Sequence, residues 1–109
     1  MKYVRVYEGD FVEDEYLTTY QEHCERVAIL QDNGFDFEGY IVKQADTIEE
    51  LCDEFVIWTE NKKAKELANY DVAKVFMRNY NVIIYGAIWT DKGLIYVAKM
   101  NDKGELELL

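Results

Sequence analysis

The sequence has no proline, six glycines and only two cysteines among its 109 residues. The lack of proline and the scarcity of glycine exclude collagen-like and low-complexity chains. Two cysteines cannot form a disulfide framework, so Cys24 and Cys52 are expected to be reduced thiols. No apolar run approaches the ~20 residues of a membrane span, and no apolar segment typical of a secretory signal follows Met1. We therefore expect a cytoplasmic protein.

Basic residues are also few. The chain has 12 basic and 22 acidic residues, and its net charge is −10. Direct binding to nucleic acid or to an anionic membrane is disfavoured, because both require a basic surface. Residues 1–60 carry 16 acidic and four basic residues, a net charge of −12, whereas residues 61–109 carry six and eight, a net charge of +2. Either a cationic partner or chance composition explains this asymmetry.

The apolar content indicates a folded chain. Half of the residues are hydrophobic and 15% are aromatic, which is too apolar for a disordered acidic tail. A chain of this length typically forms one domain with its own core. No repeat or linker divides the sequence, so we predict a single acidic domain over residues 1–109.

The first half of the chain has mixed patterns. Branched and aromatic residues predict a strand over 2–8, and apolar residues at i, i+3/i+4 spacing predict a helix over 13–28. Asn33-Gly34 predicts a hairpin turn with arms at 29–31 and 35–42. The helix and the hairpin compete for residues 25–31, and we assign the end of that segment to the hairpin.

Antiparallel structure is predicted for the second half. A capping box at Thr47 and Glu50 predicts the start of a helix. We expect an α+β fold with a mostly antiparallel sheet and two or three helices. The other expected elements are a short strand over 55–59, a helix near 63–78, and a three-stranded meander over 82–89, 94–98 and 105–108, with turns at 90–93 and 101–104.

No arrangement of residues predicts catalysis or a cofactor. His23, Cys24 and Cys52 are the only soft metal ligands, whereas a structural zinc site needs four. Asp53 and Glu54 oppose formation of a Cys52 thiolate beside His23. Both cysteines fall on predicted apolar faces, so we expect them to pack in the core. We expect no metal, no cofactor and no enzymatic activity.

Tyrosine and tryptophan are unusually frequent. The chain has nine tyrosines and two tryptophans, residue types that are enriched at protein interfaces. Tyr16 and Tyr20 are predicted to share a helix face, and Tyr85 is predicted to face Tyr96 across the last hairpin. Packing within the sheet is the alternative explanation for these residues.

Two stretches resemble a known group of proteins. Residues 46–56 (DTIEELCDEFV) and 85–109 (YGAIWTDKGLIYVAKMNDKGELELL) resemble small accessory proteins of Firmicutes phages and mobile elements, over 36 of the 109 residues. No reaction, cofactor or catalytic residue carries over from them. The resemblance implies a genomic neighbourhood in which small acidic proteins often inhibit host defence, anti-CRISPR proteins among them, and hence the cytoplasm of a bacterial host.

The charge, the lack of catalytic residues and the resemblance together predict a protein that binds and inhibits a basic, nucleic-acid-handling host protein such as a nuclease. Its carboxylates would occupy sites that normally hold phosphates. The alternative is a small homo-oligomeric structural or adaptor domain, a homodimer for example, that pairs through the edge strand 105–108. An enzyme that uses carboxylates ranks third. The candidate partner-binding residues are Asp10, Glu13, Asp14, Glu15, Glu22, Glu25, Asp36, Glu38, Glu49, Glu50, Asp53 and Glu54.

Overall fold

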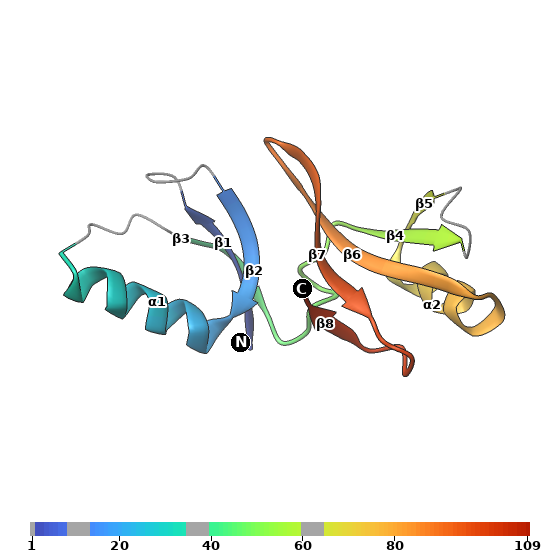
Figure 1. Ribbon diagram of the computed structural model, residues 1–109, viewed down its shortest axis with the longest axis horizontal. Coiled ribbons are helices and arrows are strands. Elements are labelled where there is room, and N and C mark those ends of the chain that lie inside the picture. The colour runs from blue at the N-terminus through green and yellow to red at the C-terminus, as the bar shows by residue number, and fades with distance from the viewer. Residues whose placement is uncertain (1, 9–13, 35–39, 60–64) are drawn as a thin grey trace. The chain divides into compact units, whose positions relative to one another are not determined.

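The computed structural model describes residues 2–8, 14–34, 40–59 and 65–109 (Figure 1). The chain divides into two compact units, an N-terminal unit of Met1–Leu51 and a C-terminal unit of Cys52–Leu109. The described residues form two helices and eight strands in two antiparallel sheets, which confirms the α+β class.

The N-terminal unit is a three-stranded sheet with one helix. Its central strand is β1, which pairs antiparallel with β2 on one side and with β3 on the other. Alternate residues of β1 are buried, among them Val4 and Val6, as expected for a strand with one face in a core. The strand predicted over 2–8 is confirmed. The elements are β1 (Tyr3–Glu8), β2 (Asp14–Thr19), α1 (Tyr20–Asp32) and β3 (Tyr40–Ala45).

The helix predicted over 13–28 is wrong in its first half, where the chain forms β2. Tyr16 pairs with Val6 and Thr18 with Val4, so branched and aromatic residues join the sheet despite their helical spacing. Thr19 then caps α1, because its hydroxyl accepts a hydrogen bond from the Glu22 backbone N–H at 3.1 Å. Tyr16 and Tyr20 therefore do not share a helix face.

The hairpin predicted around Asn33-Gly34 is also wrong in its first arm. Residues 29–31 belong to α1, which ends at Asp32. The Asn33 side chain donates to the Ile29 carbonyl over 2.8 Å, and Gly34 has a φ of 79°. The Asn-Gly pair therefore ends a helix, the other common use of a positive φ. Residues 35–39 of the second arm lie outside the described residues.

No helix follows the capping box at Thr47. The Thr47 hydroxyl does donate to the Glu50 carboxylate over 2.8 Å, but residues 46–51 form bends and one turn. The chain has too little length for a helix here, because β3 ends at Ala45 and β4 begins at Glu54. Ile48 and Leu51, the apolar residues of the expected helix face, are buried from within this turn.

The C-terminal unit is a five-stranded antiparallel sheet in the order β5-β4-β6-β7-β8, with α2 on one face. The three-stranded meander of β6, β7 and β8 is confirmed. Phe55, Ile57, Ala73, Ile84 and Met100 form the core cluster between sheet and helix. The elements are β4 (Glu54–Thr59), β5 (Lys65–Ala68), α2 (Tyr70–Asn79), β6 (Val82–Thr90), β7 (Gly93–Met100) and β8 (Leu106–Leu108).

The helix expected near 63–78 is shorter than predicted. Residues 65–68 form β5 and pair with β4, because Leu67 lies opposite Val56 in the sheet. The Asn69 side chain then accepts a hydrogen bond from the Val72 backbone N–H at 2.9 Å and fixes the start of α2. The short strand expected over 55–59 is confirmed as β4.

Gly86, in β6, has no room for a side chain. A Cβ added there would lie 2.7 Å from the Cys52 sulfur and 3.3 Å from the Ala98 Cβ. We expect Gly86→Ala to lower the free energy of unfolding by about 1–3 kcal/mol, as overpacking does. Adding Cys52→Ala should recover part of that loss in urea unfolding, because it removes the nearest atom. A Gly86→Ala protein as stable as the wild type would contradict this packing.

Candidate functional site

The negative charge belongs almost entirely to the N-terminal unit. Met1–Leu51 contains 13 acidic and four basic residues, a net charge of −9, whereas Cys52–Leu109 contains nine and eight, a net charge of −1. The asymmetry seen in the sequence thus follows the division into units. The acidic surface is a property of the first unit.

Two of the four basic residues in that unit neutralise carboxylates within the fold. The Arg5 Nε donates to Glu15 over 2.6 Å between β1 and β2, and both side chains are largely buried. Arg26, on α1, donates to Glu8 through its Nε at 2.7 Å and its Nη2 at 3.2 Å. Both guanidinium groups therefore hold secondary structure elements together.

Glu8 is the centre of a polar cluster that attaches α1 to the sheet. It is 8% exposed, and its carboxylate also accepts a hydrogen bond from the Tyr16 hydroxyl at 2.7 Å. Burial raises the pKa of Glu8, but hydrogen bonds from Arg26 and Tyr16, with the charges of Arg26 and His23, outweigh burial and hold that pKa below its ordinary value. Burial and the contact with Glu8 raise the pKa of Tyr16. This carboxylate has a structural role.

Helix α1 presents exposed carboxylates. Glu22 lies in its first turn, where negative charge is favourable, and accepts a hydrogen bond from the Thr18 hydroxyl at 2.8 Å. Glu25 accepts one from the Gln21 amide at 3.2 Å, and Asp32 is exposed at the last position of the helix. Within the described ranges, no cation pairs with any of these three acids. We call Glu22, Glu25 and Asp32 the α1 acids.

Few contacts cover this helix. His23 is the one residue of α1 that is buried, and Ile29 is 59% exposed. Most of the surface of α1 is therefore accessible to a partner. Asp32 is a site residue that the sequence did not predict, because it was assigned to a hairpin turn.

The turn after β3 carries a second pair of acids, Glu49 and Glu50. Glu50 is exposed, and its carboxylate is held by Thr47. Lys43 donates to the Glu50 backbone carbonyl at 2.8 Å, so its contact there is with the main chain. Glu49 is half-buried. These two acids lie on one turn, as their adjacency in the sequence requires.

The remaining predicted contacts are scattered. Glu15 is engaged by Arg5, and Asp14 opens β2. Asp53 belongs to the C-terminal unit, where its carboxylate accepts a hydrogen bond from the Trp89 backbone N–H at 2.8 Å. Glu54 is half-buried in β4. Asp10, Glu13, Asp36 and Glu38 lie outside the described residues.

The soft ligands are dispersed as well. Cys24 is exposed on α1, so its expected place in a core is wrong; the helix begins seven residues later than predicted, which changes the residues it buries. Cys52 is half-buried, close to Gly86. In the part of the chain that the structure describes, no three His, Cys, Asp or Glu side chains are grouped to hold a metal ion.

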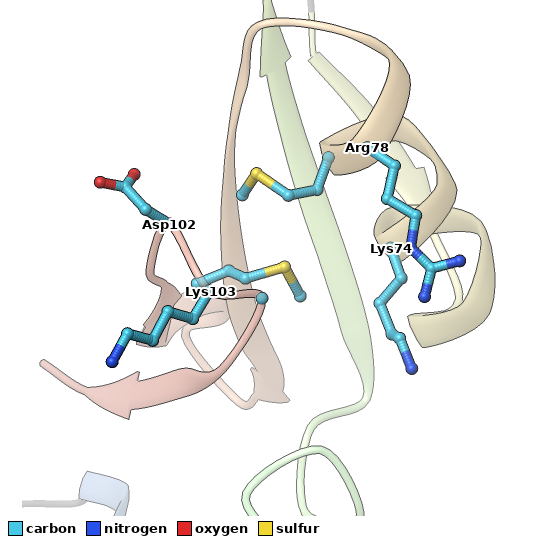
Figure 2. A pocket seen from close by; sticks show the side chains of 7 residues that line it. Lys74, Arg78, Asp102 and Lys103 are labelled. Atoms are coloured by element: carbon cyan, nitrogen blue, oxygen red, sulfur yellow. The ribbon is translucent and has the colours of Figure 1, made fainter.

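A cavity of about 380 Å³ in the C-terminal unit is lined by cationic and methionine side chains (Figure 2). Its cations do not converge, because Lys103 extends away from Lys74 and Arg78. The Lys74 ammonium lies 5.0 Å from the centre of the Tyr70 ring. Arg78 lies in the last turn of α2, where positive charge favours the helix dipole. These contacts explain the cations without an anionic ligand.

No family model, curated protein or solved structure matches the chain. Among the described residues, no helix has both the length and the apolar character needed to cross a membrane. The feature with the clearest chemical consequence is the exposed, unneutralised charge of α1 within the acidic unit.

Proposed function

We propose that this protein binds a basic, nucleic-acid-handling protein and competes there with nucleic acid, without catalysing a reaction. The observation that carries the proposal is that the α1 acids are exposed and form no ion pair among the described residues, in a unit of net charge −9. Arg5 and Arg26 do not offset this charge at the surface, because they pair with Glu15 and Glu8.

The spacing of these carboxylates suits a site built for phosphates. Side chains three or four positions apart on a helix lie roughly 5–6 Å from each other. Glu22 and Glu25 are three positions apart on α1. Basic grooves on nucleic-acid-binding proteins hold rows of phosphates, and an acidic surface competes for the same Lys and Arg side chains. The resemblance to phage accessory proteins suggests that the partner is a bacterial host protein, such as a nuclease of a defence system.

Neutralising the α1 acids tests the proposal. The variant Glu22→Gln/Glu25→Gln/Asp32→Asn removes three charges and keeps side-chain shape. Exposed pairs contribute roughly 0.2–1 kcal/mol each, so affinity for the captured partner should fall roughly tenfold. The measurement is capture from bacterial lysate at low and high salt, followed by titration of the captured protein and by its displacement with duplex DNA.

A matched control removes the same number of charges elsewhere. Asp91→Asn/Asp102→Asn/Glu105→Gln changes three exposed residues of the C-terminal unit and gives the same net charge. We expect this control to bind almost as the wild type does. Equal loss in both variants would show that only total charge matters, and binding that is insensitive to salt would contradict phosphate mimicry.

A second candidate function is self-association through β8. This strand is the last in the sheet order β5-β4-β6-β7-β8, so one side of it has no partner within the described sheet. Such edges pair with further strands unless they are protected. Sedimentation that shows a concentration-dependent dimer, lost on replacing Leu108 with proline, would favour this function. A strict monomer at high concentration would contradict it.

A further inference from the structure

The C-terminal unit has an aromatic groove that the charge argument does not use. A cavity of about 350 Å³ is lined by Trp58 from β4, Ile83 and Tyr85 from β6, and Tyr96 from β7. We call these four residues the aromatic groove. Three adjacent strands therefore contribute to one apolar depression, and three of the four described residues that line it are aromatic.

The groove lies on the face of the sheet opposite α2. Trp58 is directly opposite Ile83 in the β4–β6 pair, and residues directly opposite in a sheet share a face. Ile57 and Ile84 pair with each other at the next position and belong to the core cluster that packs with Ala73 of α2. Because side chains alternate along a strand, Trp58 and Ile83 point to the other side.

Contacts between the rings hold the side chains of the groove in place. The Trp58 indole N–H donates to the Tyr96 hydroxyl over 3.0 Å. The Tyr85 and Tyr96 rings are stacked, with centroids 4.8 Å apart and planes 10° from parallel, as the sequence predicted for this pair. Rings held in this way lose little conformational freedom when a ligand binds.

The chemistry of the groove favours a cation. The faces of tryptophan and tyrosine rings carry negative electrostatic potential and attract cations that approach within about 6 Å. A guanidinium group is planar and weakly hydrated, so it stacks on aromatic rings while its N–H groups stay hydrogen-bonded. The net charge of −10 favours the encounter of the chain with cationic partners, although the unit that contains the groove is itself nearly neutral, with a net charge of −1.

We propose that the aromatic groove binds an arginine side chain of the basic partner. This inference rests on the proposed function, which supplies a partner rich in arginine, and it gives that partner a second point of contact on the C-terminal unit. Arginine is the cation that proteins use most for phosphate recognition. A protein that offers arginine to phosphates thus offers the side chain that this groove accepts.

Lys99 provides an internal check on the role of charge. It lies directly opposite Tyr85 in the β6–β7 pair and so shares the face of the groove. Its ammonium opposes the approach of another cation. Lys99→Gln should therefore strengthen arginine binding, by roughly twofold, whereas an uncharged ligand should bind the variant and the wild type equally.

The test uses a short peptide with one arginine, acetyl-Gly-Arg-Gly-amide, and the same peptide with citrulline, which has nearly the same shape and no charge. The chain has two indole N–H groups, those of Trp58 and Trp89, and ¹H–¹⁵N NMR resolves each as a separate signal. We expect the Trp58 signal to shift on titration with the arginine peptide and the Trp89 signal to stay. The citrulline peptide should bind roughly fivefold more weakly.

Variants locate the binding site. Tyr85→Leu should abolish the shift of the Trp58 signal. Trp58→Ala removes that signal and should abolish the affinity for the arginine peptide. Trp89→Ala removes an exposed ring outside the groove and should leave both the Trp58 shift and the affinity unchanged. If Trp58→Ala fails to fold, Tyr85→Leu and Lys99→Gln still decide the question. Equal binding of the arginine and citrulline peptides, or no binding of either, would overturn the inference.

The groove inference and the proposed function can be contradicted independently of each other. The α1 variant keeps the groove intact, so it should bind the arginine peptide as the wild type does while it loses the basic partner. Loss of the partner in that variant with no peptide binding would leave the proposed function standing and the groove inference wrong. If the arginine peptide binds but the α1 variant binds the partner as well as the wild type does, the groove inference stands and the proposed function is wrong.

Discussion

Replacing Arg26 with methionine is expected to lower the free energy of unfolding of the N-terminal unit by about 2–3 kcal/mol at neutral pH. The change leaves the Glu8 carboxylate, which is 8% exposed, with the Tyr16 hydroxyl but without its ion pair. Breaking a buried pair costs about 3–5 kcal/mol. The Arg26 side chain is 51% exposed, so solvent reduces that cost.

The cost should depend on pH in a defined direction. The pKa of Glu8 is lower in the folded chain than its ordinary value of 4.5, because the contacts with Arg26 and Tyr16 outweigh burial. Its ion pair therefore stabilises the fold above pH 4.5, and this contribution is lost as pH falls through the folded pKa. At a pH low enough to protonate Glu8 in the folded chain as well, the wild type and Arg26→Met should approach the same stability.

Hydrogen exchange of the Val4 and Val6 amides measures this effect within β1. A double-mutant cycle with Glu8→Gln is the control, because Arg26→Met should cost little once the charge on residue 8 is absent. The same loss at neutral and acidic pH would mean that Arg26 acts through packing of its aliphatic carbons, and the ion-pair explanation would be wrong.

The second large effect is expected at Ile84. This side chain is 0% exposed and lies in the core cluster with Phe55 and Met100. Ile84→Ala should lower the free energy of unfolding of the C-terminal unit by about 3 kcal/mol, from lost apolar contacts and the cavity left behind. Urea unfolding followed by tryptophan fluorescence measures it, because Trp58 and Trp89 both lie in this unit.

Two further variants separate burial from residue type. Ile84→Val removes one methyl group and should cost about 0.5–1.5 kcal/mol. Val75→Ala removes apolar atoms from a side chain of α2 that is 52% exposed, and should change stability by less than about 0.5 kcal/mol. Equal losses at Val75 and Ile84 would contradict the core that the structure assigns.

The sequence predicted structure best where a period-two pattern and turn residues coincide. The C-terminal meander joins strands that follow each other in the chain, and its turns contain Gly93 and Gly104, which adopt φ values of 102° and 78°. Period-two patterns and turn residues are enough to define such an arrangement. Strand 2–8 and the short strand over 55–59 were found from their branched and aromatic residues, although each also pairs with a strand far along the chain, β1 with β3 and β4 with β6.

Prediction failed where pairing with the preceding strand outweighs helical periodicity. The apolar spacing around Tyr16 and Leu67 fits a helix, yet both residues pair in a sheet, with β1 and with β4. Helical periodicity does not reveal whether an unpaired strand edge will lie nearby. The capping box at Thr47 formed its hydrogen bond without a helix, because the neighbouring strands leave no room for one.

The residues of the candidate site could be predicted only in part from the sequence, because their contacts depend on how the strands pair. Acidic residues can be counted in a sequence, but which of them are neutralised depends on register. Glu15 meets Arg5 because the two residues are diagonal neighbours in the β1–β2 pair, where Glu15 is opposite Tyr7 and Arg5 is opposite Leu17. The aromatic groove requires three strands to meet, and of its rings only the contact between Tyr85 and Tyr96 follows from one hairpin.

The boundary between the two units at Leu51 also affects the order in which they fold during synthesis. Every described strand pair of the first sheet lies between Tyr3 and Ala45, and every pair of the second lies between Glu54 and Leu108. Domains tend to fold as they emerge during synthesis, the amino-terminal part first. The acidic unit therefore has all the chain it needs to close its sheet while the ribosome is still adding the second, and the nascent protein carries its charged surface before its aromatic groove exists.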